Sequence, residues 1–286
     1  MSEQFKLKVT SAIEKVPSLP LTALKIVKLA NDINSPPKDM LDTIKMDPMI
    51  TAKVLKLINS SYFGLSQQVT DLRQALVMLG ANTVKNIALA SALLSTMRST
   101  SSVSGGLDQD ALWLRSLATA CGAKLAAKNA GVPRAQIEEF FLLGLLHDCG
   151  RIFCFQMLPQ EYMAVLIKAQ KEQLPLSEVE LSVLEMRSPQ IGGLLAERWQ
   201  LPGNIHDAIL YHENPLDSKE HGREVAIVTV ARHLVQSLNL GWSDGLLLPT
   251  LQPEVIAKSG VDFERLRGDF SVIRDEVEKA KMFIQR

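Results

Sequence analysis

The chain has 286 residues, of which 47% are hydrophobic and 22% are charged. A chain of this length and composition can bury a sizeable core, which argues against intrinsic disorder. Lysine plus arginine equal aspartate plus glutamate at 31 each, so the chain carries no net charge. That neutrality argues against a strongly electrostatic partner such as bulk nucleic acid.

The charges are unevenly distributed along the chain. Residues 1–100 contain 12 basic and 7 acidic side chains, whereas residues 101–286 contain 19 and 24. The two parts therefore carry formal charges of +5 and −5. Two interpretations stay open: uneven solvated faces, or electrostatic help in docking the two parts together.

Targeting signals are missing from the pattern of apolar residues. The first six residues lack the apolar stretch of a secretory signal. The apolar run Phe140–Leu146 has seven residues, whereas a membrane span needs ~20. Cys121, Cys149 and Cys154 lie in apolar surroundings, and we expect them to be reduced core residues. These features predict a cytoplasmic protein that does not contact a membrane.

Helical spacing of apolar residues predicts about five helices in the first hundred residues. Proline is tolerated in a first turn, so Pro36–Pro37 can begin a helix. Asp71 is expected to cap the start of a helix that Gly80 ends. The expected helices lie at about residues 24–30, 36–44, 49–58, 71–80 and from 82 onward.

A small, polar stretch without periodicity follows at residues 99–106. We therefore expect an N-terminal helical subdomain (1–98), a Ser/Gly-rich linker (99–107), a larger helical core (108–240) and a C-terminal helical extension (241–286). Helices after the linker are predicted at 108–130, 134–157, 159–173, 176–186, 189–199, 203–212, 222–239 and 262–285. Alternating strand patterns are scarce, so the predicted fold class is all-α.

The pair His147–Asp148 follows a long apolar stretch of the predicted helix 134–157. It resembles the pair with which the HD superfamily of metal-dependent phosphohydrolases binds a divalent ion. A catalytic metal usually has three or more protein ligands and an open position for water. A working site would therefore need further ligands near this pair.

The resemblance also indicates where those further ligands would lie, and this chain differs there. The corresponding positions hold Arg115, Ser188, Tyr211 and Arg232. A guanidinium cannot donate a lone pair to a metal. At most His147, Asp148 and His212 remain as ligands, so the chain resembles a degenerate member of the superfamily.

Several motifs in a fixed order strengthen the resemblance. They are Val16–Pro20, Asp47–Gly64, Ala75–Gly80, Trp113–Ser116, Gly144–Arg151, Ala196–Pro202 and Tyr211–Glu213. Together they are similar to the HDOD family, the HD-related output domain of bacterial signalling proteins, over roughly residues 13–240. The resemblance implies an all-α, multi-helix HD-like domain with a helical N-terminal subdomain. It also implies a regulatory or scaffolding role.

If no metal is bound, the carboxylate of Asp148 needs another partner when it is buried. We expect a salt bridge to Asp148 from Arg115, Arg232 or Arg151. Alternatively, the same arginines form an anion pocket for a phosphate or nucleotide, because guanidinium forks match phosphate oxygens. The candidate binding residues are Arg115, His147, Asp148, Arg151, Ser188, Tyr211, His212 and Arg232.

Three functions from different classes follow. The first is a non-catalytic signalling module that binds other signalling proteins and needs no cofactor. The second is a metal-dependent phosphohydrolase acting on a nucleotide or phosphate ester, with a divalent metal at His147, Asp148 and His212. The third is an anion or nucleotide sensor. The sequence indicates neither an oligomeric state nor the identity of a partner.

Overall fold

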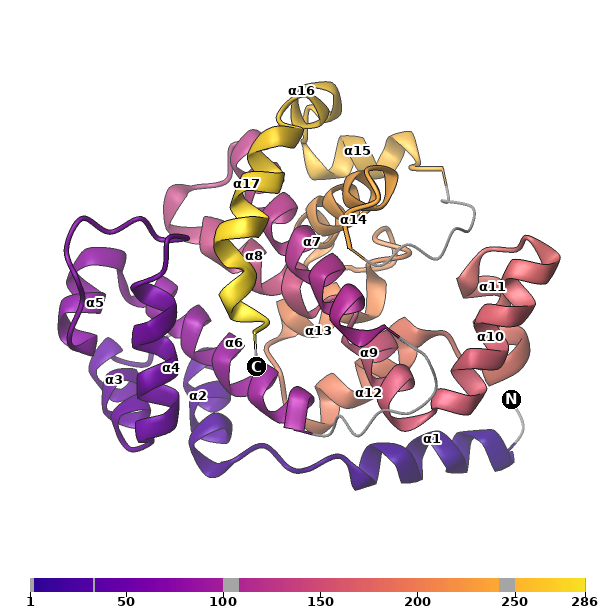
Figure 1. Ribbon diagram of the computed structural model, residues 1–286, viewed down its shortest axis with the longest axis horizontal. Coiled ribbons are helices and arrows are strands. Elements are labelled where there is room, and N and C mark those ends of the chain that lie inside the picture. Colours follow the sequence, from indigo (N-terminus) through magenta and orange to yellow (C-terminus); the bar gives the residue numbers. More distant parts are fainter. Residues whose placement is uncertain (1–2, 33, 100–107, 242–249, 286) are drawn as a thin grey trace.

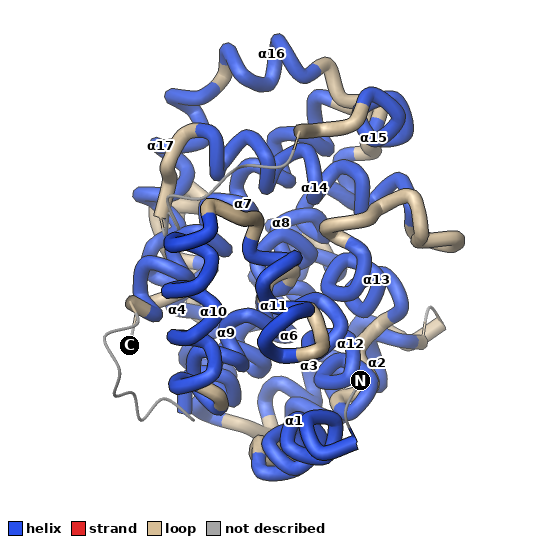
Figure 2. Tube along the Cα trace, turned by 90° about the vertical axis from the view of Figure 1, so that its right-hand side faces the viewer, coloured by secondary structure: helices blue, strands red, loops and turns tan. Residues whose placement is uncertain are grey.

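A computed structural model describes residues 3–32, 34–99, 108–241 and 250–285. Every regular element in these ranges is a helix (Figure 1). The view in Figure 2 likewise contains helices and connecting loops, without a strand in the described part of the chain. The predicted all-α fold class is confirmed.

The N-terminal part contains six helices, one more than the approximate number expected. They are α1 (Glu3–Lys15), α2 (Leu21–Asn31), α3 (Pro37–Lys45), α4 (Pro48–Ile58), α5 (Leu72–Leu79) and α6 (Ala81–Ser99). Helix α1 was not predicted. It buries Val9, Ala12 and Ile13, whose spacing of three and four residues gives an apolar stripe on one face.

Capping residues mark the start of α4 and both ends of α5. The Asp71 carboxylate accepts hydrogen bonds from the backbone N–H groups of Arg73 (2.7 Å) and Gln74 (3.0 Å). Asp47 does the same for the N–H groups of Met49 and Ile50 at the start of α4. Gly80 ends α5 with φ of 82°, a conformation that glycine adopts without strain. The predicted cap at Asp71 and stop at Gly80 are confirmed.

The larger part of the chain folds around α7 (Gln109–Asn129), which is buried along most of its length. The helices that follow it are α8 (Ile137–Leu146), α9 (Cys149–Met157), α10 (Pro159–Glu172), α11 (Leu176–Leu184), α12 (Ser188–Arg198), α13 (Gly203–Tyr211) and α14 (Gly222–Ser237). Helices α8 and α14 pack directly on α7. Close packing with α8 depends on Gly144, because an ideal Cβ there would lie 2.7 Å from the Cα of Ala120.

The predicted continuous helix at 134–157 was wrong. The short 3-10 helix η1 (Arg134–Gln136) precedes α8, and the chain turns at His147–Asp148 before α9 begins. Asp148 has φ −101° and ψ 20°, outside the helical range. Because both helices are buried, apolar residues continue across the turn. The spacing of apolar residues therefore gives no sign of the turn.

The C-terminal part packs against the same core. It contains α15 (Pro253–Ser259), which was not predicted, α16 (Phe263–Gly268), α17 (Phe270–Ala280) and the 3-10 helix η2 (Lys281–Phe283). The predicted single helix at 262–285 is therefore divided near Asp269. Helix α17 lies along α7 (Figure 1) and buries Ile273, Val277 and Ala280.

An aromatic cluster joins the three parts of the chain. The ring of Phe283 lies 5.6 Å from that of Tyr62 and 4.9 Å from that of Phe141. Tyr62 comes from the N-terminal part and Phe141 from α8. The predicted linker at 99–107 lies outside the described residues, apart from Ser99 at the end of α6.

The apolar run Phe140–Leu146 was predicted to be too short for a membrane span, and the three cysteines were expected to lie in the core. The segment Arg134–Met157 is long and apolar enough to cross a membrane, but 89% of its most apolar window is buried inside the protein. It is therefore packed as part of the core. Cys121, Cys149 and Cys154 are buried and free, as expected.

Candidate functional site

The turn between α8 and α9 places His147 and Asp148 in the interior, where they are 0% and 1% exposed. The carboxylate of Asp148 forms ion pairs with the guanidinium of Arg115 and, at 3.2 Å, with Nη1 of Arg151. Burial alone would raise the pKa of this carboxyl. Arg151 and Arg115 outweigh burial and hold the pKa of Asp148 well below its ordinary value. The predicted arginine counter-charge is confirmed.

Arg151, on α9, connects three carboxylates. Besides Asp148, its guanidinium lies 3.3 Å from Oε1 of Glu180 on α11 and 3.4 Å from Oε1 of Glu213. Its Nε donates a hydrogen bond to the hydroxyl oxygen of Tyr162 (2.8 Å). The planar guanidinium of an arginine carries five N–H donors, so one arginine can pair with several carboxylates at once.

Ser188, at the start of α12, completes the environment of Glu180. Its backbone N–H and its hydroxyl both donate to Oε2 of Glu180, at 2.8 and 3.0 Å. The Tyr162 hydroxyl donates to Oε1 at 2.5 Å. Burial raises the pKa of Glu180 in spite of the adjacent Arg151. Ser188 therefore belongs to the charged network, through Glu180.

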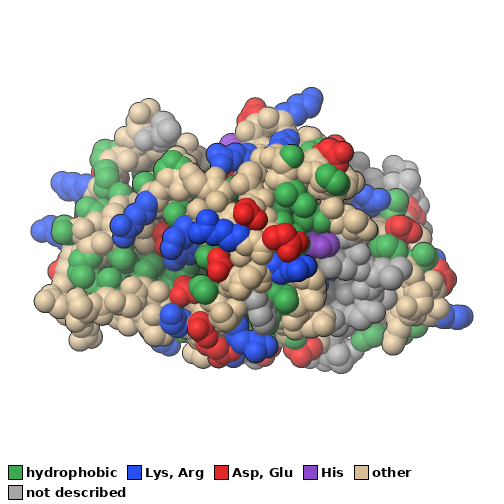
Figure 3. All heavy atoms as spheres, turned by 90° about the horizontal axis from the view of Figure 1, so that it is seen from above, with side chains coloured by type: hydrophobic (Ala, Val, Ile, Leu, Met, Phe, Trp, Pro, Cys, Tyr) green, Lys and Arg blue, Asp and Glu red, His purple; other side chains and the backbone are tan. Residues whose placement is uncertain are grey.

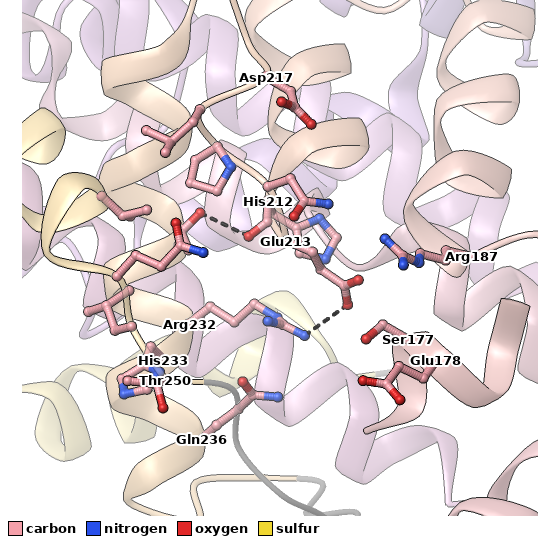
Figure 4. A pocket seen from close by; sticks show the side chains of 17 residues that line it. Ser177, Glu178, Arg187, His212, Glu213, Asp217, Arg232, His233, Gln236 and Thr250 are labelled. Carbon is pink, nitrogen blue, oxygen red and sulfur yellow. Dashed lines mark hydrogen bonds and ion pairs between the residues drawn. The ribbon is translucent and has the colours of Figure 1, made fainter. Parts of the chain in front are cut away.

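Of the three arginines that were alternatives for pairing with Asp148, Arg232 on α14 is the one that forms no ion pair with it in the described structure. Its Nη2 lies 3.3 Å from Oε1 of Glu213, which it shares with Arg151 (Figure 4). Glu213 follows His212 at the end of α13 and lies between the two arginines. The ion-pair partner of Arg232 is therefore Glu213.

The two histidines face each other beside Asp148. Their rings are 4.9 Å apart and nearly perpendicular, at 86°. Nδ1 of His147 lies 2.7 Å from the carbonyl oxygen of Gly144, and Nδ1 of His212 lies 2.9 Å from that of Ile209. A carbonyl only accepts, so each Nδ1 carries the proton and each Nε2 keeps its lone pair.

Both histidines are neutral at physiological pH. Burial lowers the pKa of His212 to about 3, and the nearby positive charge of Arg232 contributes to this shift. Burial also holds the pKa of His147 well below its ordinary value, with a further contribution from His212. Neutral imidazoles with free Nε2 atoms are suited to metal binding in principle.

The donor set nevertheless does not fit a catalytic metal. The Nε2 atoms of His147 and His212 have no hydrogen-bond partner in the described structure. The third potential ligand, Asp148, already binds two guanidinium groups. No group of three His, Cys, Asp or Glu residues among those described is arranged to hold a metal ion. Arg115, which pairs with the Asp148 carboxylate, has no lone pair to donate to a metal.

The structure brings together seven of the eight predicted site residues, directly or through shared partners. Tyr211 is the exception: its half-buried side chain makes none of the hydrogen bonds or ion pairs that join the described members of the network. Three further residues, Glu180, Tyr162 and Arg187, were not predicted from the sequence. Glu180 could have been found, because it lies four residues after Leu176 on the buried face of α11.

A pocket of about 440 Å³ opens beside this network. Glu213 and Arg232 lie on its inner wall, and Arg187, from the turn before α12, lies opposite Arg232 (Figure 4). The remaining wall comes from α14, from the connection between α13 and α14, and from the residues around α15. The pocket is the solvent-facing side of the ion network.

These features define the class of protein: a helical HD-like domain in which arginine side chains occupy the surroundings of the histidine–aspartate pair. The family model of the HDOD domain matches residues 16–215. The chain belongs to the HDOD family, which is related to the HD phosphohydrolase superfamily.

Solved structures share the whole architecture. An HDOD domain protein of unknown function from Geobacter sulfurreducens is 25% identical, with a TM-score of 0.76, over 96% of this chain and 98% of that one. A Shewanella amazonensis protein, named provisionally as a phosphohydrolase, is 20% identical, with a TM-score of 0.74 over 96% and 98%. At that identity the likeness shows the fold alone.

A further match comes from sequence alone. An uncharacterized protein of Treponema pallidum is 25% identical over 233 residues, which are 81% of this chain and 44% of that protein. The chain therefore spans less than half the length of this relative.

Proposed function

We propose that this protein is a non-catalytic regulatory module that acts in bacterial signal transduction by binding another protein. The observation that carries the proposal is the pairing of Asp148 with Arg115 and Arg151. A metal at this position would have to compete with two guanidinium groups for one carboxylate. Arg115 cannot replace the missing ligand, because it has no lone pair to donate.

Exposed hydrophobic side chains on the N-terminal part support a protein partner. Six large apolar side chains between residues 21 and 78 have more than a third of their surface exposed. They are Leu21, Leu24, Met46, Met49, Val77 and Met78. Figure 3 shows hydrophobic side chains gathered on the left of the molecule, where Figure 1 places α3, α4 and α5. Exposed methionines adapt to a partner's surface readily.

The charge distribution indicates what kind of partner would fit. Residues 1–100 carry an excess of five positive charges. An acidic, amphipathic segment of another signalling protein would complement both the charge and the apolar side chains. The membership of the chain in the HDOD family supports a signalling role for such an interaction.

The first test concerns the metal. The protein is purified without chelator, its metal content is measured by elemental mass spectrometry, and hydrolysis of bis(p-nitrophenyl) phosphate is assayed with added manganese or iron. We expect substoichiometric metal and no hydrolysis above that of a His147→Ala/Asp148→Ala variant. Stoichiometric metal together with activity that the variant loses would instead establish a phosphohydrolase.

The second test concerns the partner. Proteins crosslinked to the chain in its native host are compared between the natural sequence and a Met49→Glu/Val77→Glu variant. The matched control is Ile167→Glu, which alters an exposed apolar residue on α10. We expect the Met49/Val77 change to remove a partner that the control retains. Identical partners in all three, or none, would contradict the proposal.

A further inference from the structure

The pocket beside the ion network has the size and position of a ligand site. Its volume of about 440 Å³ lies within the ~300–1,000 Å³ typical of small-molecule pockets. Its inner wall holds Glu213 and Arg232, whose side chains are only 14% and 12% exposed. Polar side chains of Ser177, Gln236 and Thr250 also face this space (Figure 4).

Arg187 lines the pocket without a carboxylate partner of its own among the described residues. It makes no ion pair with the described residues, and its Nε is buried without a hydrogen-bond partner. The Nε of Arg232 on the opposite wall is likewise buried and without a partner. A buried donor without an acceptor costs free energy, so both guanidinium groups gain from an acceptor placed between them.

The charge of the pocket's inner wall points to the same need. On this wall, Arg187 and Arg232 contribute two positive charges and Glu213 contributes one negative charge. His147 and His212 are neutral. Glu178 and Asp217 also line the pocket, but their side chains are exposed at its rim, where water screens them. The inner wall therefore has an excess of positive charge.

We propose that this pocket binds the phosphate or carboxylate group of a small molecule between Arg187 and Arg232. Guanidinium groups bind both anions through paired, charge-assisted hydrogen bonds. Leu251 and Val255 provide an apolar wall for the rest of the ligand. Binding of this anion would not require a protein partner, and Arg187 was not among the site residues predicted from the sequence.

Isothermal titration calorimetry and thermal unfolding test this site with three probes: inorganic phosphate, adenosine monophosphate and succinate. Ionic strength is matched with potassium chloride. The diagnostic variant is Arg187→Gln, with Arg187→Lys as a change that keeps the charge but removes the fork. Arg134→Gln is the control, because Arg134 is an exposed arginine of the same core that forms no ion pair with the described residues.

We expect at least one probe to bind and to raise the unfolding temperature in proportion to its concentration. Loss of the paired hydrogen bonds in Arg187→Gln should weaken the affinity about tenfold or more. Arg187→Lys should be intermediate, and Arg134→Gln should bind normally. Tighter binding of adenosine monophosphate than of phosphate would identify a phosphate ester as the ligand class, and preference for succinate a carboxylate.

Two outcomes would overturn the proposal. One is the absence of binding by all three probes to a natural chain that is folded. The other is binding with the same affinity in Arg187→Gln as in Arg134→Gln. The unfolding temperature of each variant without ligand shows whether the variant is folded, and Arg187→Lys serves if Arg187→Gln is not.

Discussion

A buried carboxylate needs a positive charge nearby, and Asp148 obtains it from two arginine side chains. Each arginine comes from a different helix, Arg115 from α7 and Arg151 from α9. The pairing therefore ties these helices together as well as balancing the charge. The stability of the core therefore depends on the presence of both the carboxylate and its arginine partners.

The mutual dependence of Arg115 and Asp148 leads to the first prediction. Arg115→Met should lower the free energy of unfolding by about 3–5 kcal/mol, because removing one partner of a buried pair leaves the other charge poorly compensated. Urea denaturation measures the change. The double variant Arg115→Met/Asp148→Asn should recover a substantial part of the loss. A double variant that is less stable by the sum of both single changes would show that the two residues are not coupled.

The second prediction concerns His212 and pH. The unfolded chain binds a proton at this histidine near pH 6.5, whereas the folded protein binds it only near pH 3. The unfolded state therefore holds more protons between these values, and stability rises with pH across this window. The contribution is complete above pH 6.5 and is lost as pH falls. At pH 5 it should reduce stability by about 2 kcal/mol relative to pH 7.5.

Comparison with His212→Asn isolates this effect. Asparagine can still donate to the carbonyl oxygen of Ile209 but does not titrate. The raised pKa of Glu180 has the opposite sign, and it cancels when the variant and the natural sequence are compared at each pH. The stability difference between the two proteins, measured by urea denaturation, should shift by about 2 kcal/mol between pH 7.5 and pH 5. A difference independent of pH would contradict the assignment.

At the scale of residues, the sequence predicted the counter-charge of Asp148 but not the distribution of partners. Residue types alone showed that arginine replaces ligands. They could not show that Arg232 pairs with Glu213, because this depends on the angle at which α14 approaches α13. Arg187 was not predicted, because the resemblance to the superfamily pointed to the next residue, Ser188, as the position of a metal ligand.

Among the helices, α9 and α12 approach each other closely at Gly150. An ideal Cβ on Gly150 would lie 1.9 Å from the carbonyl oxygen of Ser188 and 2.6 Å from the backbone nitrogen of Gly192. Only glycine permits this separation. The contact also sets the position of Ser188, which donates two hydrogen bonds to Glu180.

The third prediction follows from this contact. Gly150→Ala should destabilise the protein by about 3 kcal/mol or more, because the obstructing atoms belong to backbone that cannot turn aside. The matched control is Gly268→Ala in α16, where nothing lies within 4 Å of the added carbon. That variant should be neutral or slightly stabilising. Thermal unfolding distinguishes the two, and equal unfolding temperatures would refute the role of the contact.

Helix existence could largely be predicted, but helix interruptions could not. The break at His147–Asp148 lies between two helices that are both buried, so hydrophobic spacing continues through it. The break coincides with the position at which Asp148 pairs with Arg115 and Arg151. Helix α15 is short, with seven residues, and gives too few turns for a periodic signal.

For the whole molecule, the aromatic cluster of Tyr62, Phe141 and Phe283 joins segments that are far apart in the sequence. The cluster connects the N-terminal part, the core and the C-terminal extension. The sequence predicted a subdomain boundary at residues 99–107. The parts on either side of this boundary are nevertheless in direct contact through the aromatic cluster. Sequence composition could mark the boundary but not the contact across it.

The fourth prediction tests this connection. Phe283→Ala should lower the free energy of unfolding by about 3–5 kcal/mol, because Phe283 is a buried aromatic side chain. Val272→Ala on the exposed side of α17 should change stability little. Calorimetry should show a single transition in the natural protein. Two separate transitions, with only one shifted by Phe283→Ala, would show that the parts unfold independently.

The two arginines that pair with Asp148 belong to the same polypeptide as the carboxylate. A metal site is filled only when the ion is available, and a shortage of iron or manganese leaves part of a metalloprotein population incomplete. The positive charges at Asp148 are encoded in the same chain and are produced with it in fixed proportion. Every newly made copy thus carries its own counter-ion, whatever the supply of metal in its surroundings.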